Sequence, residues 1–182
     1  ATDHARRVAD YLAHLDEQLE RTLRLYVYGS AAVSLLLADR EEYERGYTAD
    51  IDIGAMEPDS VDVALNPDAV DPPLTLQTHS VEQWLVHLDW RASTVSYQRL
   101  LGTEFLDVQL LHPLDLITTK LERFAPQDVE DGVFLVREYE LDVDVASKRV
   151  REAWQFYAGS QRARLQVEAA FASVFDETVR LE

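Results

Sequence analysis

The stretch LYVYGSAAVSLLLA, residues 25–38, decides the fold that this sequence predicts. Residues 25–28 predict a strand, Gly29 and Ser30 break it, and residues 31–38 are apolar and favour a helix. A glycine at such a turn lets a ligand approach the backbone closely. The N–H groups at the start of the helix, with Ser30 as the expected cap, favour an anionic group such as a phosphate. An ordinary capped helix has the same sequence, so a ligand site needs a second feature beside the turn.

That second feature is the acidic pair Asp50 and Asp52, which alternates with Ile51 and Ile53 in a short apolar run. Side chains two residues apart on a strand point to the same face, so the carboxylates are expected side by side while the isoleucines enter the core. Two like charges this close favour a bridging cation, and paired carboxylates suit Mg²⁺ or Mn²⁺. A solvated edge strand with two surface aspartates is the alternative.

A strand ending in Gly-Ser, a helix and then a hydrophobic-flanked Asp-x-Asp resemble the nucleotidyltransferase superfamily with the DNA polymerase β-like fold. Within it, the chain is most similar to AbiEii-type toxins and related small bacterial nucleotidyltransferase-like proteins. Arg45 and Thr48 match an arginine and a threonine that often precede the acidic pair there. The segments HPLDLITTKL, residues 112–121, and QDVED, residues 127–131, are similar to two further motifs, and the likeness runs roughly over residues 25–135.

The resemblance implies a set of nucleotide and metal ligands. Asp50 and Asp52 would bind the metal ions, and the groups that hold the nucleotide would be Gly29, Ser30, Arg45, Thr48 and Lys120. The chain departs from the family pattern in a longer interval between Ser30 and Asp50, which contains a charged insertion at residues 39–47. It also carries acidic residues where a basic one more often stands before the aspartate at position 128.

In the superfamily a third carboxylate on a neighbouring strand completes the metal site and can accept the proton of the attacking hydroxyl. Asp107 is the first choice for it, because residues 106–108 place a lone carboxylate in an apolar strand, where charges are rarely found without a partner. Asp62 and Asp89 are competitors. An edge strand facing water would explain Asp107 equally well.

The downstream motifs imply that Lys120 and Asp128 face the nucleotide. Lys120 borders the apolar stripe of a predicted helix, and it could extend its ammonium to the rim of the site and neutralise triphosphate charge. The alternative is a surface lysine paired with Asp115 or Glu122. For Asp128 the alternative is a cap at the start of the following helix.

The charge balance limits the partners. The chain has 34 acidic and 17 basic residues, with a formal net charge of −17, so strong general binding to nucleic acid is not expected without a local basic patch. A small molecule or a protein fits this charge better, and the acidity is also typical of a halophilic surface. Candidates for a basic patch are Lys148, Arg149, Arg151, Arg162 and Arg164, which can also pair with Glu152 and Glu168 on solvated helix faces.

Several classes of site and location are excluded or disfavoured. The absence of cysteine excludes disulfides, thiol catalysis and a cysteine-ligated zinc. No apolar run approaches the roughly 20 residues that span a bilayer, and the first residues lack the apolar region of a secretory signal, so a cytoplasmic chain without a membrane partner is expected. The five histidines show no metal-ligand spacing and are interpreted as structural or surface residues.

Hydrophobic periodicity predicts an α/β protein with a small mixed sheet flanked by helices and a C-terminal helical portion. Residues 1–112 would form the nucleotidyltransferase-like core, and residues 113–182 would pack on it as helices. Helices are expected at 4–23, 31–38, 113–124, 128–139, 143–157 and 161–180, strands at 25–28, around 50–53, at 74–78 and at 105–111, and a short element at 81–88. Residues 61–65 could form a short strand or a turn of helix.

The function expected from the resemblance is Mg²⁺-dependent transfer of a nucleoside monophosphate from an NTP to a hydroxyl acceptor. The acceptor would be a tRNA, a protein or a small molecule, and a toxin-like role would add an antitoxin protein as partner. Three alternatives stay open: a nucleotidyltransferase that modifies cationic aminoglycosides, a non-catalytic binding module that retains the fold, and a purely structural domain without a metal.

Overall fold

The computed structural model describes residues 3–40, 42–43, 47–59 and 65–182. It confirms the predicted α/β fold, with a mixed five-stranded sheet and a helical C-terminal part. The chain forms two compact units: residues 1–81 together with 93–111, and residues 82–92 together with 112–182. The second unit begins one residue before the expected division at 112/113 and also takes up residues 82–92, which were expected in the core.

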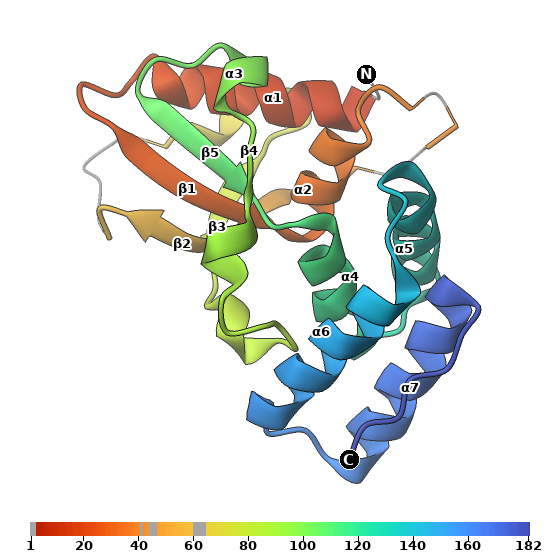
Figure 1. Cartoon of the computed structure of the whole chain (residues 1–182). Helices are drawn as coiled ribbons and strands as arrows, with labels where there is room; N and C mark the ends of the chain where they lie inside the picture. Colours follow the sequence, from red (N-terminus) through yellow and green to blue (C-terminus); the bar gives the residue numbers. More distant parts are fainter. Residues whose placement is uncertain (1–2, 41, 44–46, 60–64) are drawn as a thin grey trace. The chain divides into compact units, whose positions relative to one another are not determined.

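The first unit contains the sheet, whose strand order is β3-β2-β1-β5-β4 (Figure 1). The central strand β1 runs antiparallel to β2 and parallel to β5, while β3 runs parallel to β2 and β4 antiparallel to β5. The C-terminal end of β1 therefore lies at the same edge of the sheet as the N-terminal ends of β2 and β3. The strands are β1 Leu23–Tyr28, β2 Asp50–Glu57, β3 Thr75–Thr78, β4 Val95–Ser96 and β5 Leu106–Leu110.

Helices α1 Asp3–Asp16 and α2 Gly29–Leu36 bury apolar faces in this unit, where α1 contacts α2 and β5 and α2 contacts β1 and β2. The expected helix over 4–23 ends early, at Asp16. The carboxylate of Asp16 accepts hydrogen bonds from three successive backbone N–H groups, those of residues 104–106. These three hydrogen bonds hold the start of β5 against the C-terminal end of α1.

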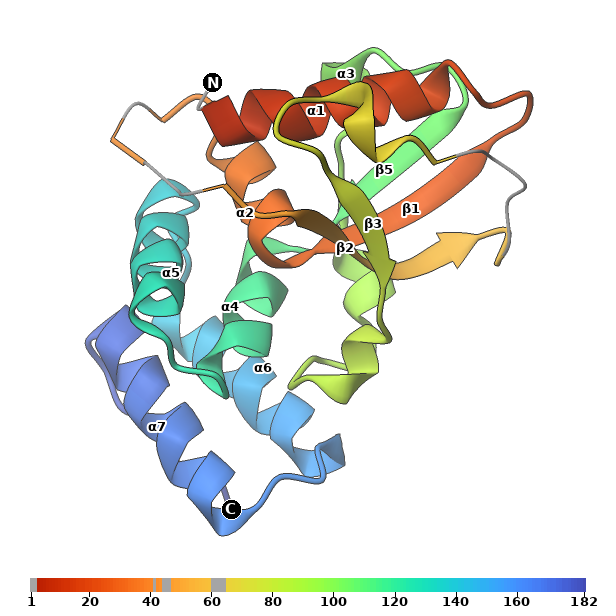
Figure 2. The ribbon, with the colours of Figure 1, turned by 180° about the vertical axis from the view of Figure 1, so that it is seen from behind.

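The second unit is built from four helices (Figure 2): α4 Pro113–Leu121, α5 Pro126–Glu138, α6 Val143–Phe156 and α7 Gln161–Phe175. All four were expected within a few residues of these bounds. Side-chain caps explain three of the starts, because His112 accepts from Leu114 N–H, Asp142 from Val145 N–H and Ser160 from Ala163 N–H. Helix α7 ends at Phe175 because the next residue adopts a left-handed conformation, with φ of 56°.

The remaining elements are short and were missed or only outlined by periodicity. They are α3 Gln98–Leu101, the two-residue β4 and the 3-10 turns Pro67–Ala69, Val81–Gln83 and Trp90–Ser93. The strand expected at 74–78 is confirmed as β3 and that at 105–111 as β5. Of residues 61–65, only Leu65 is described, and it lies in no helix or strand; the rest of that interpretation, and Asp62 with it, lies outside the described residues. No helix in the described ranges is both long and apolar enough to cross a membrane.

Candidate functional site

The turn between β1 and α2 brings Gly29 into contact with the acidic strand. Gly29 has a φ of +65°, a conformation that L side chains rarely adopt. A Cβ atom at this position would lie 2.3 Å from the Oδ2 atom of Asp52. Only a residue without a side chain lets the carboxylate occupy this place, so Gly29 is required by its backbone angle and by Asp52 at once.

The predicted alternation along β2 is confirmed. Ile51 and Ile53 are fully buried, whereas Asp50 and Asp52 are half-buried on the opposite face. Asp52 lies opposite Tyr28, the last residue of β1, in the antiparallel ladder. The two acidic residues therefore stand at the edge of the sheet where β1 turns into α2.

Ser30 does not cap the helix as expected. Helix α2 begins at Gly29, so Ser30 lies in its first turn, and the residue at the cap position is Tyr28. No side-chain cap hydrogen bond is formed at this end of the helix. Helix α2 therefore starts directly at Gly29, beside the carboxylate of Asp52.

Thr48 links the acidic strand to α1. Its hydroxyl lies 3.1 Å from His4 Nε2 and donates to the carbonyl of Asp50 at 3.2 Å, while Arg7 donates to the carbonyl of Thr48. These bonds hold the N-terminal end of β2. Arg45, the other residue expected near the nucleotide, lies outside the described residues.

Asp107 is not brought to the acidic pair, which corrects its expected role as third ligand. In the sheet it lies opposite Arg24, whereas Asp52 lies opposite Tyr28 on the other side of β1. Four residues along β1 correspond to about 13 Å, and two strand spacings add about 10 Å across the sheet. Asp107 instead accepts hydrogen bonds from Arg24 Nε and Gln109 Nε2, both at 2.6 Å.

The strand beside β2 carries an amide and a hydroxyl next to the acidic pair. In the parallel ladder between β2 and β3, Gln77 lies opposite Asp52 and Thr75 opposite Asp50. Among the described residues, no three histidine or acidic side chains gather as a metal site. Two carboxylates still fit Mg²⁺, because this ion commonly takes one or two protein carboxylates and completes its shell with phosphate oxygens and water.

In the second unit, Lys120 and Asp128 form a buried ion-pair cluster. The ammonium of Lys120 lies 2.8 Å from Asp128 and 3.0 Å from Asp131, and all three side chains are at most 5% exposed. Arg123 adds two hydrogen bonds to Asp128. Burial alone would raise the pKa of Asp128, but the bonds from Arg123 and the charge of Lys120 lower it to about 2. Lys120 therefore joins α4 to α5 and does not extend to the surface as expected.

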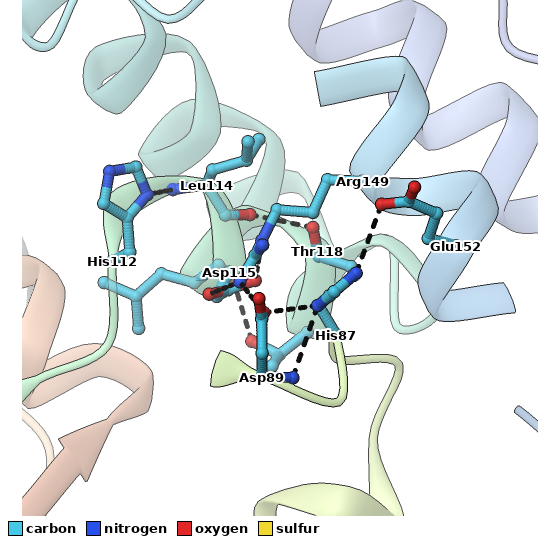
Figure 3. A network of polar contacts seen from close by, with 10 residues as sticks. His87, Asp89, His112, Leu114, Asp115, Thr118, Arg149 and Glu152 are labelled. Carbon is cyan, nitrogen blue, oxygen red and sulfur yellow. Dashed lines mark hydrogen bonds and ion pairs between the residues drawn. The ribbon is translucent and has the colours of Figure 1, made fainter. Parts of the chain in front are cut away.

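A second polar network, shown in Figure 3, holds residues 82–92 within the same unit. Arg149 binds the fully buried carboxylate of Asp115 with two hydrogen bonds of 2.6 and 2.7 Å and lies 3.1 Å from Asp89. His87 stands between Asp89 and Glu152, with one ring nitrogen facing each carboxylate. Arg149 therefore forms its ion pairs inside this unit and is not part of the basic patch that was expected from the sequence. Asp89 is also paired inside the unit, with Arg149 and His87.

His112 has a structural role that agrees with its interpretation from the sequence. Its Nδ1 atom accepts a hydrogen bond from the N–H group of Leu114 at the start of α4. Burial lowers the pKa of His112, which keeps the ring in the neutral form that can accept this bond.

Sequence reasoning missed Arg7, Asp115 and Asp131 as organising residues. The buried carboxylate of Asp131 had a signal, because it stands three residues after Asp128 on one helix face. Arg7 binds Thr48, 41 residues away in the chain, and Asp115 binds Arg149, 34 residues away. The local spacing of residues cannot predict such distant pairs.

No family model matches the chain, and no significant match was found among curated proteins or solved structures.

Proposed function

We propose that the chain binds a nucleoside triphosphate with Mg²⁺ beside the Gly29 turn and transfers its nucleoside monophosphate to a hydroxyl acceptor. The observation that supports this most is the contact between Gly29 and the carboxylate of Asp52. Residues 23 positions apart in the sequence meet there, and each has the chemistry that a metal-bound phosphate requires.

Each group at this corner has a defined task in the proposal. The backbone at Gly29 lets phosphate oxygens approach closely, and the N–H groups at the start of α2 donate to them. The carboxylate oxygens of Asp50 and Asp52 would hold the Mg²⁺ ion, which when bound offsets the charge of the phosphates. The hydrogen bond from Thr48 to the Asp50 carbonyl keeps β2 in place for this.

A second candidate function is a nucleotide-binding module that does not transfer the nucleotide. It is favoured by Gln77, which lies opposite Asp52 where a third carboxylate would be expected to accept a proton. An amide cannot act as a general base in this way. The distance of Asp107 from the acidic pair points in the same direction.

The acceptor class and an antitoxin partner remain predictions from the sequence resemblance. In the proposal a tRNA, a protein or a small hydroxyl compound takes the nucleotide, and the net charge of −17 favours the last two.

Transfer of label from each of the four α-³²P-labelled NTPs, with Mg²⁺ and one acceptor class per assay, tests the proposal. The wild type should label at least one acceptor, and Asp52→Asn should not. Asp107→Asn is the matched variant, because it removes an aspartate of the same sheet that lies far from the corner, and it should label normally. Nucleotide binding without any labelled acceptor would select the binding module, and absence of both binding and labelling would refute both functions.

A further inference from the structure

Helix α1 buries two polar side chains near the start of β2. His4 and Arg7 stand three residues apart on one face of the helix, and their residue surfaces are 1% and 5% exposed. Apolar side chains are enough to pack a helix on a sheet, whereas buried polar groups are costly unless they are hydrogen-bonded. The two polar residues therefore point to a task at this end of the helix. The other buried residues of α1 carry no charge, and they are Ala5, Val8, Tyr11, Leu12 and Leu15.

Both side chains bind Thr48, and their hydrogen bonds assign the proton on the His4 ring. Arg7 Nη2 lies 3.4 Å from His4 Nδ1 and also donates to the Thr48 carbonyl. A guanidinium can only donate, so Nδ1 must accept. In a neutral imidazole the single N–H proton then lies on Nε2, which is 3.1 Å from the Thr48 hydroxyl oxygen. His4 therefore donates to Thr48 from Nε2.

The Thr48 hydroxyl connects this bond to the acidic strand. A hydroxyl has one proton to donate, and its oxygen can accept as well. Because the oxygen accepts from His4, the proton is left for the carbonyl of Asp50, which lies 3.2 Å away. With the proton on Nδ1 instead, Thr48 would have to donate to His4, and the Asp50 carbonyl would lose this bond. The contacts thus form one chain of hydrogen bonds, from Arg7 through His4 and Thr48 to Asp50.

We propose that His4 is a positioning residue for the metal site, an inference that rests on the proposed function, in which Asp50 is a ligand of Mg²⁺. His4 itself contacts neither the ion nor the nucleotide. It holds the backbone of Asp50 through Thr48 and so places the Asp50 carboxylate. Asp50 is the first residue of β2 and is only half-buried, so a link from α1 adds order where the strand begins. Groups that orient a metal ligand typically contribute about 10- to 100-fold to metal affinity.

Binding of Mn²⁺ together with a non-hydrolysable NTP analogue, measured by electron paramagnetic resonance on the full chain, tests the inference. His4→Phe keeps a ring but removes both nitrogens, and Thr48→Val keeps the shape of threonine but removes the hydroxyl. Each change should weaken Mn²⁺ binding about tenfold or more. The double variant should bind no more weakly than the weaker single variant, because both changes break the same chain of hydrogen bonds.

His14→Phe is the matched control, because it makes the same substitution in α1 at a partly exposed histidine that lies 3.5 Å from Glu17. It should bind Mn²⁺ as the wild type does. Thr48→Ser keeps the hydroxyl and should also bind as wild type, and His4→Gln keeps an N–H donor and should lose less affinity than His4→Phe. A purely structural role of His4 would instead lower the free energy of unfolding in His4→Phe and leave the metal affinity of the folded chain unchanged.

A second measurement depends neither on a ligand nor on the folding of a variant. The ¹⁵N NMR signals of the His4 ring in the wild type should show the proton on Nε2 and none on Nδ1. A wild type that binds no Mn²⁺ with the analogue would refute the proposed function and the role of His4 with it. If the wild type binds, the positioning role alone is overturned by unchanged affinity in His4→Phe and Thr48→Val, by additive losses in the double variant, or by a proton on Nδ1.

Discussion

Replacing Gly29 by alanine should destabilise the first unit by more than its backbone angle alone requires. The φ of +65° imposes a cost of about 1–2 kcal/mol on any L side chain. The new Cβ would also lie 2.3 Å from Asp52 Oδ2, so the carboxylate must leave its position. Forcing a side chain from its rotamer adds about 0.5–1.5 kcal/mol, which brings the total to about 1.5–3.5 kcal/mol.

Gly102 provides a matched control for this prediction. It has a nearly identical φ of +71°, but a Cβ added there would meet no atom within 4 Å. Gly102→Ala should therefore cost only the backbone term of about 1–2 kcal/mol. The excess of Gly29→Ala over Gly102→Ala isolates the contact with Asp52.

Native-state hydrogen exchange of the amides in β1 and β2 is the suitable assay. All three tryptophans, Trp84, Trp90 and Trp154, belong to the helical unit, so tryptophan fluorescence would report the other half of the chain. In an Asp52→Ala background, Gly29→Ala should cost about the same as Gly102→Ala, because the carboxylate is gone. Equal costs of the two glycine substitutions in the wild-type background would refute the close approach of Asp52 to the turn.

Three further predictions concern Asp128, the ion pair of Arg149 with Asp115, and Asp107. Below a pH of about 4, the free energy of unfolding of the helical unit should fall by about 2 kcal/mol as the pH approaches the pKa of Asp128 near 2. The reason is that the Asp128 carboxylate takes up a proton more readily in the unfolded chain than in the folded one. In urea unfolding followed by tryptophan fluorescence, Asp128→Asn should abolish this part of the pH dependence. Arg149→Met should destabilise the same unit by about 3–5 kcal/mol, because it leaves the fully buried Asp115 without its cation, and an additional Asp115→Leu change should recover much of the loss in the same assay; no recovery would contradict the pairing. Asp107→Asn should leave Mg²⁺-dependent nucleotide binding within twofold of wild type in calorimetry, whereas a loss of tenfold or more would place Asp107 at the metal after all.

The turn and the acidic strand were predictable because their signals are local. Gly29 follows a strand and precedes an apolar helix, and the alternation of Asp50 and Asp52 with buried isoleucines depends only on the period of a β-strand. The structure agrees with both features. Ser30 was expected at the N-cap of the helix, but the N-cap is Tyr28, two residues earlier. Residue preferences locate helix ends only to within one or two positions.

The role of Asp107 was not predictable in this way. The strand at 105–111 was expected, but its position relative to Asp52 depends on the pairing order and register of three strands. Register is set by long-range packing, and no spacing in the sequence contains it. An aspartate in an apolar strand needed a partner, as expected, and the partner proved to be Arg24 and not a metal ion.

Lys120 illustrates a second limit. It was expected at the border of an apolar stripe, but every residue of α4 is buried, and the position of its ammonium depends on the helix that follows. The chain reverses after α4, with a left-handed residue at Phe124, so that Asp128 and Asp131 on α5 meet the lysine. A buried ammonium with two carboxylates is the result.

The most direct test of the central claim is the location of a bound metal ion. Mn²⁺ added with a non-hydrolysable NTP analogue broadens the NMR signals of nearby amides, and the account predicts the strongest broadening at Gly29 and in β2 around Asp52. In Asp52→Asn this local broadening should disappear. Broadening spread evenly over the acidic surface, or unchanged in the variant, would contradict a metal and phosphate site at this corner.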